Sequence, residues 1–222
     1  MYERRNTDAM PHPHWPLFDL EVRTPRVTLR YADDALCMQL ATLASKGIHD
    51  PTSMPFATPW TDVEPPELER QAYRFWWGCR ADTAPAKWHL VLAALVGDTV
   101  VGATSLVSSE FAVTRTFETG SWLGREHQGH GLGKEMRYAT LQLGFDGFGA
   151  ERATTGAFTD NAASLGVTRS LGYEPNGRLR HERRGELAES LRFQMTREHW
   201  ATIRRDDISL HGVDAARELL GL

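Results

Sequence analysis

Few features that mark membrane or nucleic-acid-binding proteins occur in this sequence of 222 residues. Its longest uninterrupted apolar run, residues 90–96, is about a third of the ~20 residues that a membrane-spanning helix needs. Lys and Arg number 25 against 29 Asp and Glu, so no cationic surplus is available to neutralise a phosphate backbone. We therefore expect neither a membrane nor a nucleic acid among the partners.

Cysteine is almost absent and the histidines are scattered. Cys37 and Cys79 lie far apart and outside any paired metal spacing, which is typical of free thiols in a reducing compartment. His12 and His14 flank a proline without a Cys or acidic partner at ligand spacing, so we expect no metal site. Residues 1–15 have no apolar core of a secretory signal. Together these features predict a cytoplasmic protein without a metal.

The length favours one domain, and the residue patterns predict a mixed α/β sheet. The prolines clustered at 51–66 are interpreted as an ordered loop rather than a domain boundary. A turn at 97–98 joins two of the strands as a hairpin. Alternation and capping residues predict strands at 22–32, 88–96, 99–109, 116–124, 151–159 and 190–200, and helices at 33–47, 67–82, 132–147 and 160–172.

The segment 116–159 has the order strand, helix, strand. Apolar residues at spacings of four, three and four predict the helix: Leu132, Met136, Ala139 and Leu143. Such a crossover normally places its two strands parallel, with a right-handed connection. The stretch QGHGLG, residues 128–133, therefore falls at the N-terminus of the crossover helix.

A helix start exposes unpaired backbone N–H groups and a partial positive charge, and glycines let an anion approach them. A tight turn or a close helix–strand contact also favours glycine. Walker A is excluded because Gln128 and Glu135 stand where it requires glycine and a hydroxyl. The dinucleotide fingerprint is not met either, since the three glycines are spaced by two throughout.

Gln128, Gly131 and Gly133 match the pattern Q/R-x-x-G-x-G/A, which resembles the pyrophosphate signature of the GNAT N-acyltransferases. RTPRVTLRYADDA, GSWLG and DNAASLGVTRSLGY resemble the branch that acetylates ribosomal-protein N-termini. PHWPLFDL, MPFATPW and TGSWLGREHQGHG are similar to an actinobacterial subgroup associated with succinyl-CoA. The resemblance covers roughly residues 22–200. It implies an N-terminal extension at 1–21, a GNAT domain at 22–200 and a partly helical tail at 201–222.

This resemblance implies an α/β GNAT fold, whose mostly antiparallel sheet has parallel, splayed central strands flanked by helices. It also implies acetyl-CoA or succinyl-CoA as the acyl donor. The side chain of Asn161 would contact the pantetheine, although an N-cap role is equally open. The implied cofactor-binding residues are Trp122, Leu123, Gln128, Gly129, His130, Gly131, Leu132, Gly133, Lys134 and Asn161.

For catalysis, the resemblance implies Glu118 as the base that deprotonates the amine, directly or through water, against the alternative of a solvated strand glutamate. Ser164 would lie near the sulfur. Many relatives carry a tyrosine acid where this chain has Thr168. Ser164, a water or simple release of the thiolate remain as ways to complete the transfer.

The donor, the acceptor and the assembly stay open. The basic run at 178–186 is either a solvated hairpin or a patch that receives a carboxylate, with candidates Arg178, Arg180, Arg183 and Arg184. The acceptor is an amine of unknown identity. RFWWGC and AARELLGL, together with the resemblance, favour a homodimer. A catalytically silent CoA-binding or sensor domain is the alternative function.

Overall fold

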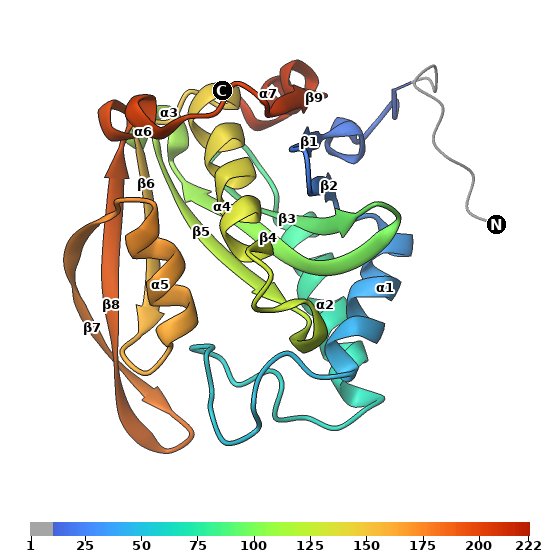
Figure 1. Cartoon of the computed structure of the whole chain (residues 1–222). Coiled ribbons are helices and arrows are strands. Elements are labelled where there is room, and N and C mark those ends of the chain that lie inside the picture. The colour runs from blue at the N-terminus through green and yellow to red at the C-terminus, as the bar shows by residue number, and fades with distance from the viewer. Residues whose placement is uncertain (1–10) are drawn as a thin grey trace.

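The computed structural model describes residues 11–222, which form one nine-stranded sheet (Figure 1). The strand order is β7-β8-β6-β5-β4-β3-β2-β1-β9. All neighbouring strands are antiparallel except β5 and β6, which are parallel. The predicted mixed sheet is therefore confirmed. The strands are β1 (Glu21–Arg23), β2 (Thr28–Tyr31), β3 (Lys87–Val96), β4 (Thr99–Ser109), β5 (Thr116–Leu123), β6 (Arg152–Phe158), β7 (Glu174–Arg183), β8 (Glu186–Thr196) and β9 (Ser209–His211).

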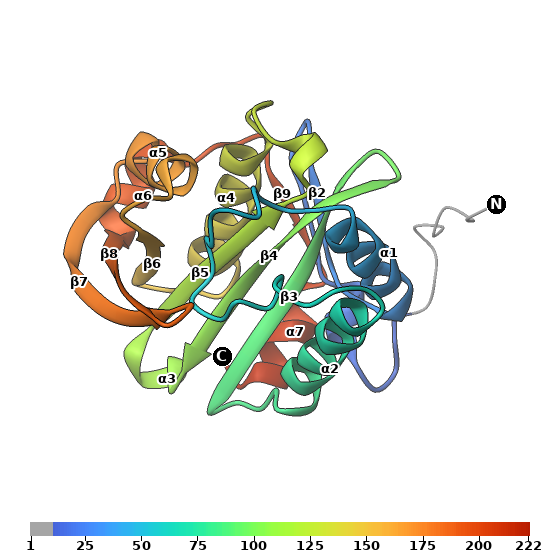
Figure 2. The ribbon, with the colours of Figure 1, turned by 90° about the horizontal axis from the view of Figure 1, so that it is seen from below.

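Helices cover both faces of the sheet (Figure 2). On one face α1 and α2 pack on β3 and β4 over a smaller core, and on the other α4 and α5 cover the main core. No helix in residues 11–222 combines the length and apolarity needed to cross a bilayer. The helices are α1 (Asp34–Ser45), α2 (Glu67–Ala81), α3 (Phe111–Thr114), α4 (Leu132–Gln142), α5 (Ala162–Ser170), α6 (Arg197–Ile203) and α7 (Val213–Leu220).

Two predicted strands differ from the structure. The strand expected at 22–32 is a hairpin of β1 and β2, because Thr24 bonds Val27 through its backbone and its hydroxyl and so closes a turn around Pro25. The strand expected at 190–200 begins earlier, at Glu186, and ends at Thr196. The Thr196 hydroxyl accepts a hydrogen bond from the backbone of His199 and starts α6.

The basic run also has more regular structure than the sequence predicted. Residues 178–183 belong to β7, which pairs along most of its length with β8, so only the turn at 184–185 lies between strands. The run is therefore part of a β-hairpin, which agrees with the solvated-hairpin interpretation, although the sequence patterns predict no strand for β7. Leu179 and Leu187 are largely exposed on it, as expected at the edge of a sheet.

The two ends of the described chain pack into the same sheet. Strand β9 pairs with β1, and α7 follows it. Leu17 and Leu20 from the first segment join Ala216 and Leu220 from the last in the main core. The division at 1–21, 22–200 and 201–222 stays a prediction, but both flanking segments contribute buried apolar side chains.

The main core is tightest where α4 passes over β5. Helix α4 continues into a π-helical turn, Leu143–Gly147, and the buried Phe117 ring lies against Gly144 so closely that a Cβ there would overlap it. This contact fixes the crossover helix against the first strand of its own strand–helix–strand unit. Glycine at 144 is therefore a packing requirement.

We expect Gly144→Ala to lower the free energy of unfolding by about 1–3 kcal/mol, because the added methyl must displace a buried ring in a closely packed core. Urea unfolding followed by tryptophan fluorescence measures this change. Gly166→Ala in α5 is the control, since a Cβ there meets open space and should stabilise by up to about 1 kcal/mol. Equal stability of Gly144→Ala and the unchanged protein would contradict this packing argument.

Candidate functional site

The parallel pair β5–β6 parts halfway along its length. The two strands pair only from Thr116–Arg152 to Thr119–Thr155. Beyond that point β5 runs on to Leu123 alongside β4, and β6 runs on to Phe158 alongside β8. Residues 120–123 of β5 and 156–158 of β6 therefore do not pair with each other along their facing edges. This opening, which we call the wedge, offers unpaired backbone groups to a ligand.

Threonine hydroxyls close the ladder where the wedge begins. Thr155 Oγ1 donates to the carbonyl of Thr119 at 3.0 Å, and Thr104 Oγ1 donates to the carbonyl of Gly120 at 3.1 Å. Both hydroxyls are buried. The Thr155 hydroxyl thus satisfies a backbone carbonyl of the last β5–β6 pair, whereas Thr104 binds β5 from the side of β4, which stays paired with it.

The glycine turn lies at the open end of the wedge. Gly129 and Gly131 both have φ of 78°, a region that glycine enters without steric cost. Gly131 is the N-cap of α4 and provides no side-chain cap, so the N–H groups of the first turn remain available to an anion. The structure therefore places the predicted phosphate loop where a ligand entering the wedge would pass.

The side chains of this loop have defined partners. The Gln128 amide donates to the carbonyls of Ile48 at 2.6 Å and Leu123 at 2.9 Å, which ties the loop to the end of β5. Lys134 Nζ donates to the Ser170 carbonyl at 3.3 Å, across to α5. Gln128 thus shapes the loop through its side chain.

Arg26 is a cation at this loop that the sequence analysis missed. Its Nη2 donates to the carbonyl of His130 at 2.8 Å, and its Nη1 lies 3.4 Å from where a Cβ on Gly131 would be. It comes from the β1–β2 turn, 104 residues away, so no local pattern connects it with the loop. A guanidinium here adds positive charge beside the uncapped helix start.

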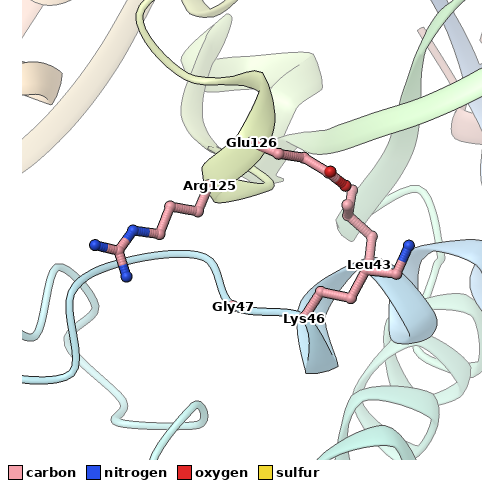
Figure 3. A pocket seen from close by; sticks show the side chains of 5 residues that line it. All are labelled: Leu43, Lys46, Gly47, Arg125 and Glu126. Atoms are coloured by element: carbon pink, nitrogen blue, oxygen red, sulfur yellow. The ribbon is translucent and has the colours of Figure 1, made fainter.

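A hollow of about 310 Å³ lies beside the loop, between the end of α1 and the turn Arg125–His127 (Figure 3). Figure 3 shows Lys46 and Glu126 on one side of it and the Arg125 side chain directed away from them. Its lining carries both charges and comes from the α1 side, not from the inner edges of β5 and β6. We assign it no ligand.

Glu118 points to the face of the sheet opposite α4, because it alternates with Phe117, whose ring lies against Gly144. Both its oxygens accept hydrogen bonds from Arg192, each at 2.8 Å. These bonds raise the pKa of Arg192 above its usual value. Arg192 crosses Gly156, where a Cβ would come within 2.8 Å of its Nη1. The predicted base, Glu118, is therefore held by Arg192 on the sheet face opposite α4, which we call the open face.

The loop that connects α1 and α2 lies over this open face and meets the β7–β8 hairpin (Figure 2). Arg183 donates to the carbonyl of Met54 at 2.8 Å and forms an ion pair with Asp160 at 2.7 Å. Arg184 forms an ion pair with Asp62. Hydrogen bonds from these guanidiniums lower the pKa of both carboxyl groups.

The basic run is thus largely occupied by protein carboxylates. Besides these two ion pairs, Arg178 pairs with Glu189 at 3.2 Å on the neighbouring strand. Three of the four candidate arginines hold the loop or the hairpin in place. Their charge is already balanced within the chain.

The start of α5 supports one of the two roles considered for Asn161. Its Oδ1 accepts a hydrogen bond from the backbone of Ser164 at 3.0 Å, which is an N-cap. Its amide N–H groups are not used by that bond. Thr168, in the expected tyrosine position, is buried and its hydroxyl has no hydrogen-bond partner. The roles of Ser164 and Asn161 toward a ligand stay predictions.

A family model described as an acetyltransferase (GNAT) domain matches residues 26–174, about two thirds of the chain. The match includes β5, the glycine turn, α4, β6 and α5.

Solved structures share the fold at low identity. One from T. thermophilus, assigned as an acetyltransferase, has 21% identity and a TM-score of 0.64 over 83% of this chain and 93% of its own. A GNAT-family acetyltransferase from Bacillus anthracis has 15% identity and a TM-score of 0.64, over 80% and 99%. RimL, the ribosomal L7/L12 alpha-N-protein acetyltransferase in complex with coenzyme A, has 16% identity and a TM-score of 0.62, over 78% and 95%.

We expect Gly131→Val to weaken CoA binding more than tenfold, about 1.4 kcal/mol or more. A β-branched residue is strained at φ of 78°, so the turn that exposes the α4 N–H groups must change. Titration calorimetry with CoA measures the effect. Gly78→Ala, at an open position in α2, is the control and should keep the original affinity. A folded Gly131→Val protein with unchanged affinity would refute the assignment.

Proposed function

Since the chain belongs to the acetyltransferase (GNAT) family, we propose that it transfers an acyl group from a CoA thioester directly to a primary amine at the wedge. The observation that carries this proposal is the parting of β5 from β6 after Thr119 and Thr155, beside the uncapped start of α4. A thioester arm that lies between two strands meets unpaired backbone groups along its length. An anionic group on the same molecule meets the helix terminus.

The proposed binding mode assigns each part of CoA to a part of the wedge. The pyrophosphate takes the amides of residues 129–134, with Arg26 beside them. The pantetheine runs along β5 past Trp122. The carbonyl of Leu123 already accepts the Gln128 amide, so we expect other backbone groups of residues 120–123 to bind the arm. The amide N–H groups of Asn161, which its N-cap bond does not use, contact the arm from the side of β6.

The proposed reaction forms one C–N bond and breaks one C–S bond. The neutral amine attacks the thioester carbonyl, and the tetrahedral intermediate then expels the thiolate. Glu118 accepts the amine proton directly or through water, and Arg192 holds its carboxylate in one orientation. Ser164 or a water returns a proton to the sulfur, or the thiolate is simply released, because Thr168 is buried and cannot replace the tyrosine acid.

The proposal also concerns the identity of the acyl donor and of the amine acceptor. Acetyl-CoA is the donor that the family name implies. A succinyl group, favoured by the resemblance to the succinyl-CoA subgroup, ends in a carboxylate and needs a cation near the acyl end. The basic run is a weaker candidate for that cation than the sequence indicated, because three of its arginines have carboxylate partners. The acceptor remains an amine of unspecified class.

A catalytically silent CoA-binding domain is the second candidate, and the engagement of both Glu118 oxygens by Arg192 favours it. The two candidates separate in one assay. Thiol release from acetyl-CoA is followed with a dipeptide, lysine and spermine as amines. Amine-dependent release supports the transferase, whereas CoA binding without release from any amine supports the silent domain.

We expect Glu118→Gln to lower amine-dependent turnover by roughly a hundredfold and to leave CoA affinity nearly intact, because the amide cannot accept the proton. Arg192→Gln is the matched variant: it breaks the same pair but keeps the carboxylate. A base at Glu118 makes the first variant much slower than the second. Equal losses in both would show that only the pair matters, and the base would then lie elsewhere.

We also propose a homodimer formed through α2. Of the two segments that favoured it, the C-terminal one buries Ala216 and Leu220 in the core, whereas Phe75 and Trp77 are about half exposed on α2. Light scattering at micromolar concentration should give twice the chain mass. The double change Phe75→Ser and Trp77→Ser should give a folded monomer. A monomeric unchanged protein would rule the proposal out.

A further inference from the structure

Arg137 is a buried cation at the apex of the wedge. It lies on α4, and only 5% of it is exposed. Its Nη1 donates to Thr155 Oγ1 on β6 at 3.1 Å, and its Nη2 donates to Ser121 Oγ on β5 at 3.4 Å. The guanidinium thus contacts one side chain from each of the two strands, at and just beyond their last pair, Thr119–Thr155.

No counter-charge accompanies this guanidinium. Within residues 11–222 it forms no ion pair, its hydrogen bonds go to hydroxyl groups alone, and its Nε has no hydrogen-bond partner. The nearest carboxylate on its own helix, Glu135, pairs with Arg205 at 2.8 Å. Glu118, on the opposite face of the sheet, pairs with Arg192. Burial of a charge without an opposite charge is unfavourable, so an anion from outside the chain would be stabilised here.

The proposed binding mode would bring the acyl end of the donor to this position. Arg137 lies six residues after the N-cap Gly131, about 9 Å along the helix from the proposed pyrophosphate site. The pantetheine arm follows β5 from Leu123 toward Thr119, about 13 Å at the usual rise per residue. On this path the arm would pass Ser121 and its thioester would end beside Thr119 and Thr155, so the acyl group would lie near the two residues that Arg137 contacts.

We propose that Arg137 determines the acyl donor by receiving the carboxylate of a dicarboxylic acyl group, such as succinyl, on CoA. The inference rests on the proposed function, because it uses the same wedge. An acetyl group ends in a methyl and leaves the guanidinium without a counter-charge. The unpartnered Nε is buried, so a ligand carboxylate would reach it only by displacing groups packed against it. The carboxylate would then accept from the Nε N–H and from a neighbouring Nη at once, the geometry in which guanidinium binds carboxylate most strongly.

Calorimetry with four ligands tests the assignment without an amine acceptor: CoA, acetyl-CoA, butyryl-CoA and succinyl-CoA. Butyryl and succinyl both have four carbons, so their comparison isolates the carboxylate. The unchanged protein should bind succinyl-CoA about tenfold to a hundredfold more tightly than butyryl-CoA. Arg137→Gln should abolish this preference and change the affinity for CoA itself by less than about threefold.

Two further variants keep the test decisive. Arg137→Lys keeps the charge without the planar fork and should retain only part of the preference. Arg180→Gln on the basic run is the control and should retain all of it. Equal binding of butyryl-CoA and succinyl-CoA to the unchanged protein overturns the inference even if Arg137→Gln fails to fold. So does a preference that survives in folded Arg137→Gln. Absence of binding to CoA itself would instead overturn the proposed function.

Discussion

The early end of hydrogen bonding between two parallel strands is the constraint on which the site depends. Strands β5 and β6 form four residue pairs and then part, while each keeps its other neighbour. The crossover helix α4 must return from the end of β5 to the start of β6, so its N-terminus lies at the open end of the gap. A gap with unpaired backbone groups and a helix terminus with unpaired N–H groups are thus consequences of one topological choice. Phe117 against Gly144 fixes the two elements together.

The arginines near the site fall into two groups: those that pair with carboxylates and hold the structure together, and those without a carboxylate partner, which can bind a ligand. Arg183 and Arg184 pair with Asp160 and Asp62 and so join the α1–α2 loop to the β7–β8 hairpin. Because these bonds lower the pKa of the two carboxyl groups, the pairs stabilise above the ordinary carboxyl pKa and are lost as the pH falls through the lowered values. The contribution is small, since the Asp160 side chain is 56% exposed and the Asp62 side chain 35% exposed, so solvent screens both pairs. Arg137 contrasts with them because it is buried and its hydrogen bonds go to hydroxyl groups rather than to carboxylates.

Local patterns predicted the strand–helix–strand unit, the 88–109 hairpin and the glycine turn, because alternation, helical spacing and glycine chemistry are properties of neighbouring residues. They failed where one residue redirected the chain: Thr24 closes a turn within an alternating stretch, and Thr196 starts a helix within another. Local patterns could not predict contacts between residues that are far apart in the sequence. Arg192 reaches Glu118 from 74 residues away. Arg137 follows Met136 of the predicted apolar stripe, but burial of that flank depends on β5 and β6, which the helix pattern does not describe.

In the reaction proposed above, the pair between Glu118 and Arg192 would also affect which form of the amine reaches the thioester. A lone carboxylate would attract an ammonium ion, and that ion cannot attack because its nitrogen has no free electron pair. With Arg192 bound to both oxygens, the net charge presented to the acceptor is close to zero, so the attraction for an ammonium ion is weakened. The neutral amine loses less on entering such a site than the ion, which must shed its hydration shell. If Glu118 is the base proposed above, Arg192 would therefore favour the neutral, reactive amine over the ammonium ion at this carboxylate.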